Sequence, residues 1–264
     1  MLGGRCGPCP PLARVAGALR EAEAPGTNDS IYQEILMRRI LALTFAGLLL
    51  TTLALQAAPP ANPERFKTEI EAYEAADKAN PPPQNAVLFA GASGIRLWKT
   101  LAQDFPEYTV INRGFGGSQI SDNIFYAERI IIPCKPKLII FQAGGNDINA
   151  GKSPETVLAD FKTFVALIHK HLPDTRIGYL SIQPAPARWE QREQQKEANR
   201  LIKAWIADQK NVDFINAYDQ FLNSAGTPRT ELFVKDNLHH NPQGYKLRTE
   251  IVTPYLHKVL PVAK

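Results

Sequence analysis

The chain has 264 residues, of which 44% are hydrophobic and 21% are charged. This composition is typical of a globular protein, and the length allows one substantial hydrophobic core rather than two. The formal net charge of +4 comes from Lys and Arg residues scattered along the chain without a dense basic block, which argues against a nucleic-acid partner.

Residues 37–58 have the pattern of a signal peptide. Two arginines precede an uncharged apolar stretch over residues 40–55, which runs into the small residues Ala57 and Ala58. This order of basic, apolar and small residues is typical of a segment that directs export and is then removed. The apolar stretch is shorter than the roughly 20 residues of a membrane-spanning helix. We therefore expect a secreted or periplasmic protein that meets the membrane only during export.

Residues 1–36 precede this segment, although signal peptides begin at the start codon. Met37 stands directly before the two arginines, so we expect translation to start there and residues 1–36 to be an upstream extension or a wrongly assigned start. Cys6 and Cys9 form a C-x-x-C pair with no second pair and no strand–helix context, and we interpret them as incidental. The mature chain would then retain only Cys134, which excludes an internal disulfide.

Residues 59–84 are expected to form a helix followed by a linker. Phe66, Ile70 and Tyr73 recur at helical spacing, and a triple proline ends the pattern. The helix should pack across a single domain formed by residues 85–264.

Short apolar runs alternate with amphipathic segments in that domain. The expected strands span residues 86–90, 108–111, 137–141, 177–182 and 212–215. The expected helices span residues 120–131, 154–171, 189–208 and 242–260, with Ser153 and Asn241 as N-caps of the second and the fourth. Near-continuous apolar strands that alternate with helices predict a parallel sheet of about five strands inside a three-layer α/β/α domain.

Polar or glycine-rich segments follow the expected strands, where sheets of this kind bind their ligands. The segments are GASGIRLW with Ser93, NRGFGGSQISD over residues 112–122, QAGGNDI with Asn146 and Asp147, and DNLHHNPQGY starting at Asp236. Because the carboxyl ends of parallel strands meet at one edge of a sheet, we expect these segments to form one site.

A serine hydroxyl such as that of Ser93 is a weak nucleophile and needs a base that is itself oriented by a carboxylate. Asp236 and His239 are three residues apart, so their side chains can lie on the same side of a turn and supply both groups. Attack on an ester also creates an oxyanion, which requires preorganised hydrogen-bond donors. The expected donors are the Ser93 backbone N–H, a glycine N–H of the GFGG segment and the side-chain amide of Asn146.

With these four segments in this order, the sequence resembles the SGNH hydrolases, also called the GDSL esterase/lipase family, over about residues 85–260. The resemblance implies a flavodoxin-like α/β/α domain that hydrolyses esters without a metal or cofactor. It implies roles for five residues: Ser93, Asp236 and His239 as the catalytic triad, with Ser93, Gly117 and Asn146 as the oxyanion-hole donors. The second segment is similar to the platelet-activating-factor acetylhydrolase-like and carbohydrate-esterase branches, which implies short acyl groups such as acetyl.

The sequence departs from the family pattern at two positions. Ala92 replaces the usual aspartate before the serine, and His240 replaces the usual proline after the histidine. Neither position belongs to the triad, so we expect the chemistry to remain. The G-x-S-x-G turn of α/β-hydrolases is not met, because Ile95 occupies the place of its second glycine, and that fold is disfavoured.

Each segment also has an ordinary structural interpretation. Ser93 alone would fit a helix N-cap, and Asn146 an Asx-turn. Asp236 and His239 with their neighbour His240 would suit zinc, but H-E-x-x-H and further ligands are lacking, so we expect no metal. The GFGG segment lacks the full G-x-G-x-x-G spacing, so we expect no nucleotide cofactor.

The sequence therefore predicts a serine esterase that hydrolyses small acyl esters through an acyl-enzyme on Ser93. Two alternatives stay open. The same triad could transfer an acyl group to an extracytoplasmic glycan, with an alcohol in place of water, or the domain could be a non-catalytic glycan-binding module. The expected partner is a small-molecule or glycan acyl ester.

Overall fold

The computed structural model describes residues 62–261. The expected start at Met37, the expected signal peptide at 37–58 and the Cys6–Cys9 pair lie outside the described residues. Within residues 62–261, no helix is both long enough and apolar enough to cross a membrane.

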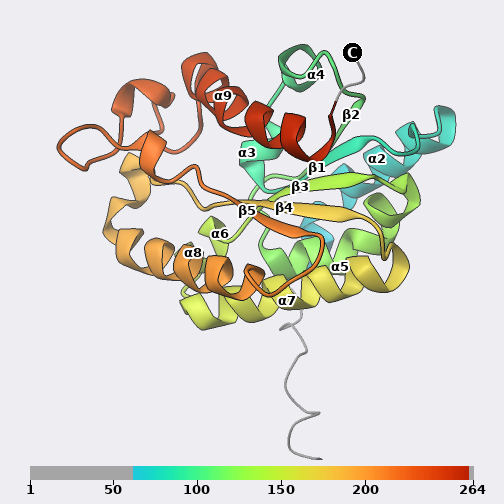
Figure 1. Cartoon of the computed structure of the whole chain (residues 1–264), viewed down its shortest axis with the longest axis horizontal. Helices are drawn as coiled ribbons and strands as arrows, with labels where there is room; N and C mark the ends of the chain where they lie inside the picture. Colours follow the sequence, from blue (N-terminus) through green and yellow to red (C-terminus); the bar gives the residue numbers. More distant parts are fainter. Residues whose placement is uncertain (1–61, 262–264) are drawn as a thin grey trace, which may run out of the picture. The chain divides into compact units, whose positions relative to one another are not determined.

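Five parallel strands form the central sheet in the order β2-β1-β3-β4-β5 (Figure 1). The strands are β1 Val87–Gly91, β2 Val110–Gly114, β3 Leu138–Gln142, β4 Arg176–Leu180 and β5 Val212–Ile215. This strand order is the flavodoxin-like one, in which the order reverses beside β1 and creates a binding crevice at the carboxyl ends. The predicted parallel α/β sheet is confirmed.

Helices cover both faces of the sheet and make the three predicted layers (Figure 1). One face carries α2 Lys67–Ala79, α5 Ile120–Ile130, α7 Pro154–His171 and α8 Arg192–Ile206. The other face carries α3 Ser93–Arg96, α4 Leu101–Asp104 and α9 Pro242–Val259. The short helix α6 Gly145–Asn149 follows β3, and five 3₁₀ turns lie at Pro63–Phe66 (η1), Ile132–Cys134 (η2), Pro186–Gln191 (η3), Asp219–Phe221 (η4) and Thr230–Leu232 (η5).

Strand β1 shows why the strands read as continuous apolar runs. Leu88 and Ala90 are buried under the helices of one face, whereas Val87 and Phe89 are buried under those of the other. Because successive side chains of a strand point to opposite faces, a strand covered on both sides is apolar along most of its length.

The helix before the sheet is part of the same core. Ile70 of α2 is completely buried, and the Tyr73 hydroxyl donates to the Gly114 carbonyl over 2.6 Å. Asp77, also on α2, forms an ion pair with the largely buried Arg113 of β2. These contacts fasten α2 to the end of β2 that leads into the glycine-rich segment.

The predicted bounds differ most from the structure at β2 and α8, and the other strands and helices are shifted by at most two residues at either end. Strand β2 continues to Gly114, so Asn112 and Arg113 lie in the strand and not in the following loop. Both polar side chains are satisfied there, because Asn112 donates to the Ile95 carbonyl over 2.8 Å and Arg113 donates to the Ile130 carbonyl over 3.1 Å. Helix α8 begins at Arg192 rather than at residue 189, because the preceding residues form a separate 3₁₀ turn.

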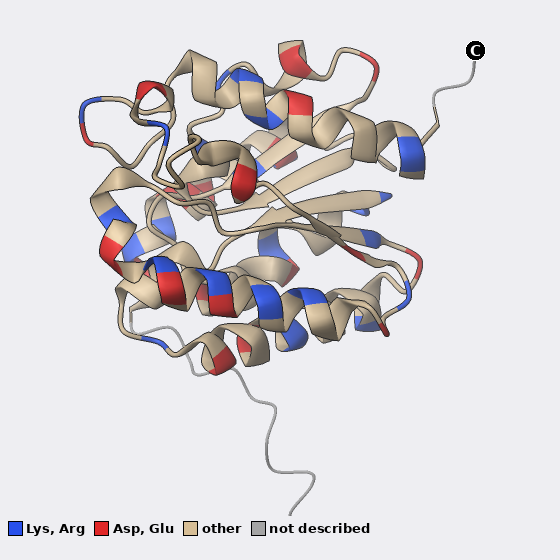
Figure 2. Ribbon diagram, turned by 60° about the vertical axis from the view of Figure 1, so that its left-hand side comes forward, with Lys and Arg blue, Asp and Glu red and all other residues tan. Residues whose placement is uncertain are grey.

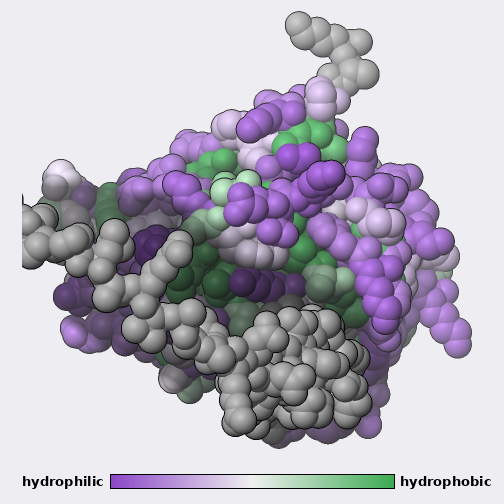
Figure 3. Space-filling view, turned by 60° about the horizontal axis from the view of Figure 1, so that its bottom comes forward, coloured by the Kyte–Doolittle hydropathy of each residue, from purple (hydrophilic) through white to green (hydrophobic). Residues whose placement is uncertain are grey.

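Acidic and basic residues are interspersed along the helices (Figure 2). On α8, for example, Lys196 pairs with Glu193 and Arg200 pairs with Glu197 one turn apart. The visible part of the described surface in Figure 3 is mostly hydrophilic, with smaller hydrophobic areas between. The helices therefore present mixed charge to their surroundings.

Candidate active site

Ser93 lies at a sharp turn that follows β1. Gly91 has a φ of +132°, and a Cβ there would lie 2.0 Å from the backbone oxygen of Gln142, so the position requires glycine. The Ala92 N–H donates to that same oxygen over 3.1 Å. The turn makes Ser93 the first residue of α3, where its own N–H has no acceptor within the helix.

Asp236 organises the loop that carries His239. Its Oδ1 accepts from the backbone N–H groups of Leu238 and His239, each over 2.9 Å. Its Oδ2 lies 2.6 Å from His239 Nδ1, and His239 Nε2 lies 3.0 Å from Ser93 Oγ. A carboxylate that accepts from Nδ1–H leaves Nε2 of the neutral imidazole as the acceptor for the serine proton. The structure thus brings the predicted triad residues into one hydrogen-bonded relay.

The Asp236 carboxyl remains ionised in this arrangement. The backbone N–H of His239 is the main group that holds the pKa of Asp236 down, to about 2, with the His239 side chain and the Leu238 N–H adding to the effect. A carboxylate that accepts several hydrogen bonds is favoured in its charged form. It can therefore stabilise the imidazolium that would form when His239 takes a proton.

Asn146 has a fixed side-chain orientation beside this relay. Its Nδ2 donates to the Ser118 carbonyl over 2.9 Å, and its Oδ1 accepts from Arg188 Nη2 over 2.9 Å. An amide nitrogen carries two hydrogens, so one N–H remains after the bond to Ser118. Asn146 and Ser93 line the same pocket, so this N–H is a suitable oxyanion donor.

Gly117 occupies a less direct position. It is exposed, with a φ of +77°, and its carbonyl accepts from Arg65 over 3.4 Å. Its N–H makes no hydrogen bond to any residue among 62–261. However, Gly117 does not belong to the pocket lining that includes Ser93 and Asn146. Gly117 as an oxyanion donor stays a prediction.

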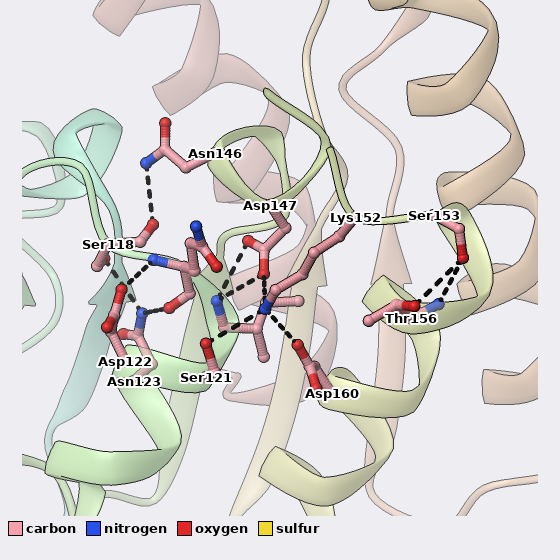
Figure 4. Close-up of polar contacts among 12 residues, drawn as sticks. Ser118, Ser121, Asp122, Asn123, Asn146, Asp147, Lys152, Ser153, Thr156 and Asp160 are labelled. Atoms are coloured by element: carbon pink, nitrogen blue, oxygen red, sulfur yellow. Dashed lines mark hydrogen bonds and ion pairs between the residues drawn. The ribbon is translucent and has the colours of Figure 1, made fainter. Parts of the chain in front are cut away.

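Asp147, the neighbour of Asn146, has a structural role that the sequence did not reveal (Figure 4). Its completely buried carboxylate accepts from the Ile120 N–H at the start of α5, over 3.2 Å, and pairs with Lys152 over 3.0 Å. Lys152 also pairs with the buried Asp160 of α7 over 2.6 Å. Burial raises the pKa of Asp147, against the opposing effect of Lys152. This network fixes the loop of Asn146 to the segment that supplies Ser118.

The two departures from the family pattern are both accommodated by packing. Ala92 is buried, as a small apolar residue can be without a partner. The His240 ring packs against the rings of Phe221, Phe233 and Tyr245, and neither ring nitrogen has a hydrogen-bond partner among the described residues. Burial is the main cause that lowers the pKa of His240 well below its usual value, with Arg248 and His239 contributing.

Arg248 of α9 donates a hydrogen bond to the turn that carries Ser93. The sequence did not indicate this role. Arg248 is completely buried, its Nη1 donates to the Gly94 carbonyl over 2.6 Å, and its guanidinium lies 4.8 Å from the centre of the Trp98 ring. Burial lowers the pKa of Arg248 to about 10, which leaves it charged at neutral pH. It joins α9 to the turn that carries Ser93.

A pocket of about 80 Å³ opens beside the relay. Its polar lining comes from strand ends, from the segments that follow them and from α8: Ser93, Gln142, Asn146, Gln183, Arg188, Gln195, His239 and His240. The sequence did not single out Gln183, Gln195 or Arg188, although Gln183 lies just past a strand, where ligands of such sheets bind. Within residues 62–261, no group of three or more His, Cys, Asp or Glu side chains is arranged to hold a metal ion.

Comparison with known proteins finds a family, relatives and solved structures that this chain resembles. The model of the GDSL-like Lipase/Acylhydrolase family matches residues 84–247. The human platelet-activating factor acetylhydrolase IB subunit alpha1 is 27% identical over an alignment of 179 residues, which covers 64% of this chain and 74% of the human protein.

Solved structures share the fold. A GDSL-like lipase from Bacteroides thetaiotaomicron aligns with a TM-score of 0.61 at 21% identity, over 76% of this chain and 99% of its own. A carbohydrate esterase family 3 protein from Talaromyces cellulolyticus aligns with a TM-score of 0.54 at 16% identity, over 67% of this chain and 99% of its own.

Proposed function

Because the chain belongs to the GDSL-like lipase/acylhydrolase family, and is thereby a hydrolase that acts on esters, we propose that it cleaves short acyl esters through an acyl-enzyme on Ser93. The observation that carries this proposal is the unbroken relay from the Asp236 carboxylate through His239 to Ser93 Oγ, with distances of 2.6 and 3.0 Å. The shorter distance is that of a hydrogen bond by which the carboxylate orients the imidazole, and the longer one is within reach for transfer of the Ser93 hydroxyl proton to His239 Nε2.

In the first step, Ser93 Oγ attacks the ester carbonyl while His239 Nε2 accepts the hydroxyl proton. The oxyanion that forms is stabilised by the free N–H of Asn146 and by the Ser93 N–H at the start of α3. The C–O bond to the alcohol then breaks, and the imidazolium returns its proton to the leaving oxygen. Ser93 carries the acyl group as an ester.

In the second step, water replaces the alcohol. His239 Nε2 takes a proton from the water as it attacks the acyl carbonyl, and the bond to Ser93 Oγ breaks. The proton returns to Ser93 Oγ, and the carboxylic acid leaves. Asp236 stays ionised throughout and stabilises the charged imidazole in both steps.

The size of the pocket supports short acyl groups. At about 80 Å³ it is far smaller than the roughly 300 to 1,000 Å³ of pockets that enclose drug-sized ligands. A long alkyl chain would have to lie outside it. The human relative is named as an acetylhydrolase, which supports the same preference.

Active-site labelling with a fluorophosphonate tests the nucleophile directly. We expect the probe to modify Ser93 and to inactivate the enzyme, and the Ser93→Ala variant to lose at least about 10⁴-fold of the rate on 4-nitrophenyl acetate. Ser224→Ala is the matched control, because Ser224 is exposed and does not belong to the pocket lining. A Ser93→Ala variant that retains wild-type activity would contradict the proposal.

Substrate length is tested with 4-nitrophenyl esters from acetate to octanoate. We expect kcat/KM to be highest for the two-carbon to four-carbon acyl groups and to fall for longer chains. An optimum at octanoate would contradict the preference for short acyl groups while leaving the role of Ser93 intact.

A further inference from the structure

Two glutamines in the pocket wall carry buried polar atoms without hydrogen-bond partners among the described residues. Gln183 is 9% exposed and Gln195 is 1% exposed, and both line the pocket that contains Ser93. Among the described residues, neither Oε1 nor Nε2 of Gln183 has a hydrogen-bond partner, and neither does Oε1 of Gln195. Three unsatisfied polar atoms thus belong to residues that line the same pocket as the nucleophile.

Such an arrangement is unfavourable for the folded protein by itself. A buried donor or acceptor without a partner has lost its hydrogen bonds to water without replacement, and most buried polar side-chain atoms in proteins have a partner. An apolar side chain of similar size would avoid this cost. The two glutamines therefore suit a bound group that completes their hydrogen bonds.

Both glutamines stand on a rigid frame. Asn199 of α8 accepts from the Ile182 N–H and donates to the Ile182 carbonyl, each over 2.9 Å, which fixes the backbone immediately before Gln183. Gln195 lies one helical turn before Asn199, on the same side of α8. The same helix thus holds one glutamine in place and presents the other, as expected for a preorganised binding site.

The chemistry of the unsatisfied atoms indicates the group that binds. Gln183 offers a donor and an acceptor, and Gln195 offers a further acceptor. A hydroxyl group both donates and accepts, so it can satisfy an amide in either direction. An alkyl group would leave all three atoms unsatisfied, and a carboxylate, which only accepts, would leave both carbonyl oxygens without a donor.

We propose that Gln183 and Gln195 recognise a hydroxyl group carried next to the scissile ester, so that the enzyme prefers hydroxylated esters to plain alkyl esters of the same size. This inference rests on the proposed esterase function. It makes the two glutamines specificity-determining residues of the Ser93 site.

Matched ester pairs test the preference and find the position of the hydroxyl. A higher kcat/KM for glycerol monoacetate than for propyl acetate would place the recognised hydroxyl on the alcohol. A higher kcat/KM for ethyl 3-hydroxybutyrate than for ethyl butyrate would place it on the acyl group. We expect the wild-type enzyme to show at least about tenfold higher kcat/KM for the hydroxylated member of one pair, since one to two net hydrogen bonds correspond to about that factor.

The variants Gln183→Met and Gln195→Met remove the amide at similar side-chain length. We expect each to bring the kcat/KM values of the preferred pair to within about threefold of one another, because the hydroxyl loses its partner. Gln191→Met is the matched control and should keep the wild-type preference, because Gln191 donates to Asn149 and does not line the pocket.

Thermal unfolding separates this role from a structural one. If the glutamines serve binding alone, Gln183→Met should unfold at the wild-type temperature or above it, because it removes two unsatisfied atoms. A lowered melting temperature together with an unchanged substrate preference would overturn the inference, and so would a wild-type enzyme that cleaves both members of both pairs equally. A wild-type enzyme that cleaves no ester would instead overturn the proposed function itself.

Discussion

The guanidinium of Arg188 donates to the side-chain oxygen of Asn146 over 2.9 Å. Because the amide nitrogen of Asn146 also donates to the Ser118 carbonyl, both ends of the amide are held. Arg188 lines the pocket and has no acidic partner among the described residues, so its position is set by this contact rather than by an ion pair. Arg188 is therefore a positioning residue for the proposed oxyanion donor.

We expect Asn146→Ala to lower kcat about 10²- to 10³-fold, because it removes a donor that acts in the transition state. Arg188→Met should lower kcat by a smaller factor of roughly 10, because the amide keeps its bond to Ser118. Steady-state kinetics on 4-nitrophenyl acetate would check both effects. An Arg188→Met variant that raised only KM would contradict the positioning role. Arg192→Met is the control, because Arg192 lies outside the pocket lining.

The two glycines near the active site should respond differently to alanine. A Cβ at Gly91 would lie 2.0 Å from the backbone oxygen of Gln142, whereas a Cβ at Gly117 would meet no atom within 4 Å. We expect Gly91→Ala to lower the free energy of unfolding by about 3 kcal/mol or more, and Gly117→Ala by about 1 to 2 kcal/mol from its positive φ alone. Urea unfolding would measure both, and equal losses would contradict the assigned close approach at Gly91.

Lys152 is predicted to be critical for stability. It pairs with two carboxylates, of Asp147 and Asp160, whose side chains are at most 2% exposed. Lys152→Met leaves both without a counter-charge, so we expect it to lower the free energy of unfolding by about 3 to 5 kcal/mol. The added substitution Asp160→Asn should restore part of the loss. Lys196→Met, which removes an exposed ion pair, should change stability by less than about 1 kcal/mol.

Much of the fold follows from local sequence signals. Helix α7 begins and ends where its periodicity predicts, with the Ser153 side chain accepting from the Thr156 N–H over 3.3 Å. The hydrogen-bonded arrangement of Ser93, His239 and Asp236 was also predictable, because Asp236 and His239 share one turn and a parallel sheet gathers its loops at one edge. The sequence predicts too early an end for β2, because Asn112 and Arg113 break the apolar pattern of the strand. Only the hydrogen-bond partners of these two side chains in the fold explain why they can lie in a strand.

Residues that act through distant contacts could not be predicted. Gln183, Gln195 and Arg188 become neighbours of Ser93 only when β4 and α8 are in place. No local pattern marks a glutamine as unsatisfied, or an arginine as the support of an amide more than forty residues away. The sequence thus defines the chemistry of the relay better than the walls of its pocket.

His240 should make stability depend on pH. Burial holds its pKa in the folded state well below the value of about 6.5 expected when unfolded. Below about pH 6.5 the unfolded state binds more protons than the folded state. The contribution of the neutral His240 imidazole to the free energy of unfolding is therefore complete above about pH 6.5 and decreases as the pH falls further, by up to about 1.4 kcal/mol per pH unit. We expect melting temperatures between pH 7.5 and 5 to fall less steeply for His240→Phe than for the wild type. Parallel slopes would contradict the burial of a neutral imidazole.

The separation of Ser93 from His239 by 146 residues has a consequence for biosynthesis. A nascent chain emerges amino-terminus first, and the nucleophile leaves the ribosome long before its base does. The relay can close only after β5 and the loop that follows it have joined the sheet. Hydrolytic activity during refolding or translation therefore reports that the sheet and the loop of His239 have formed, and a chain that stalls before His239 would be catalytically silent.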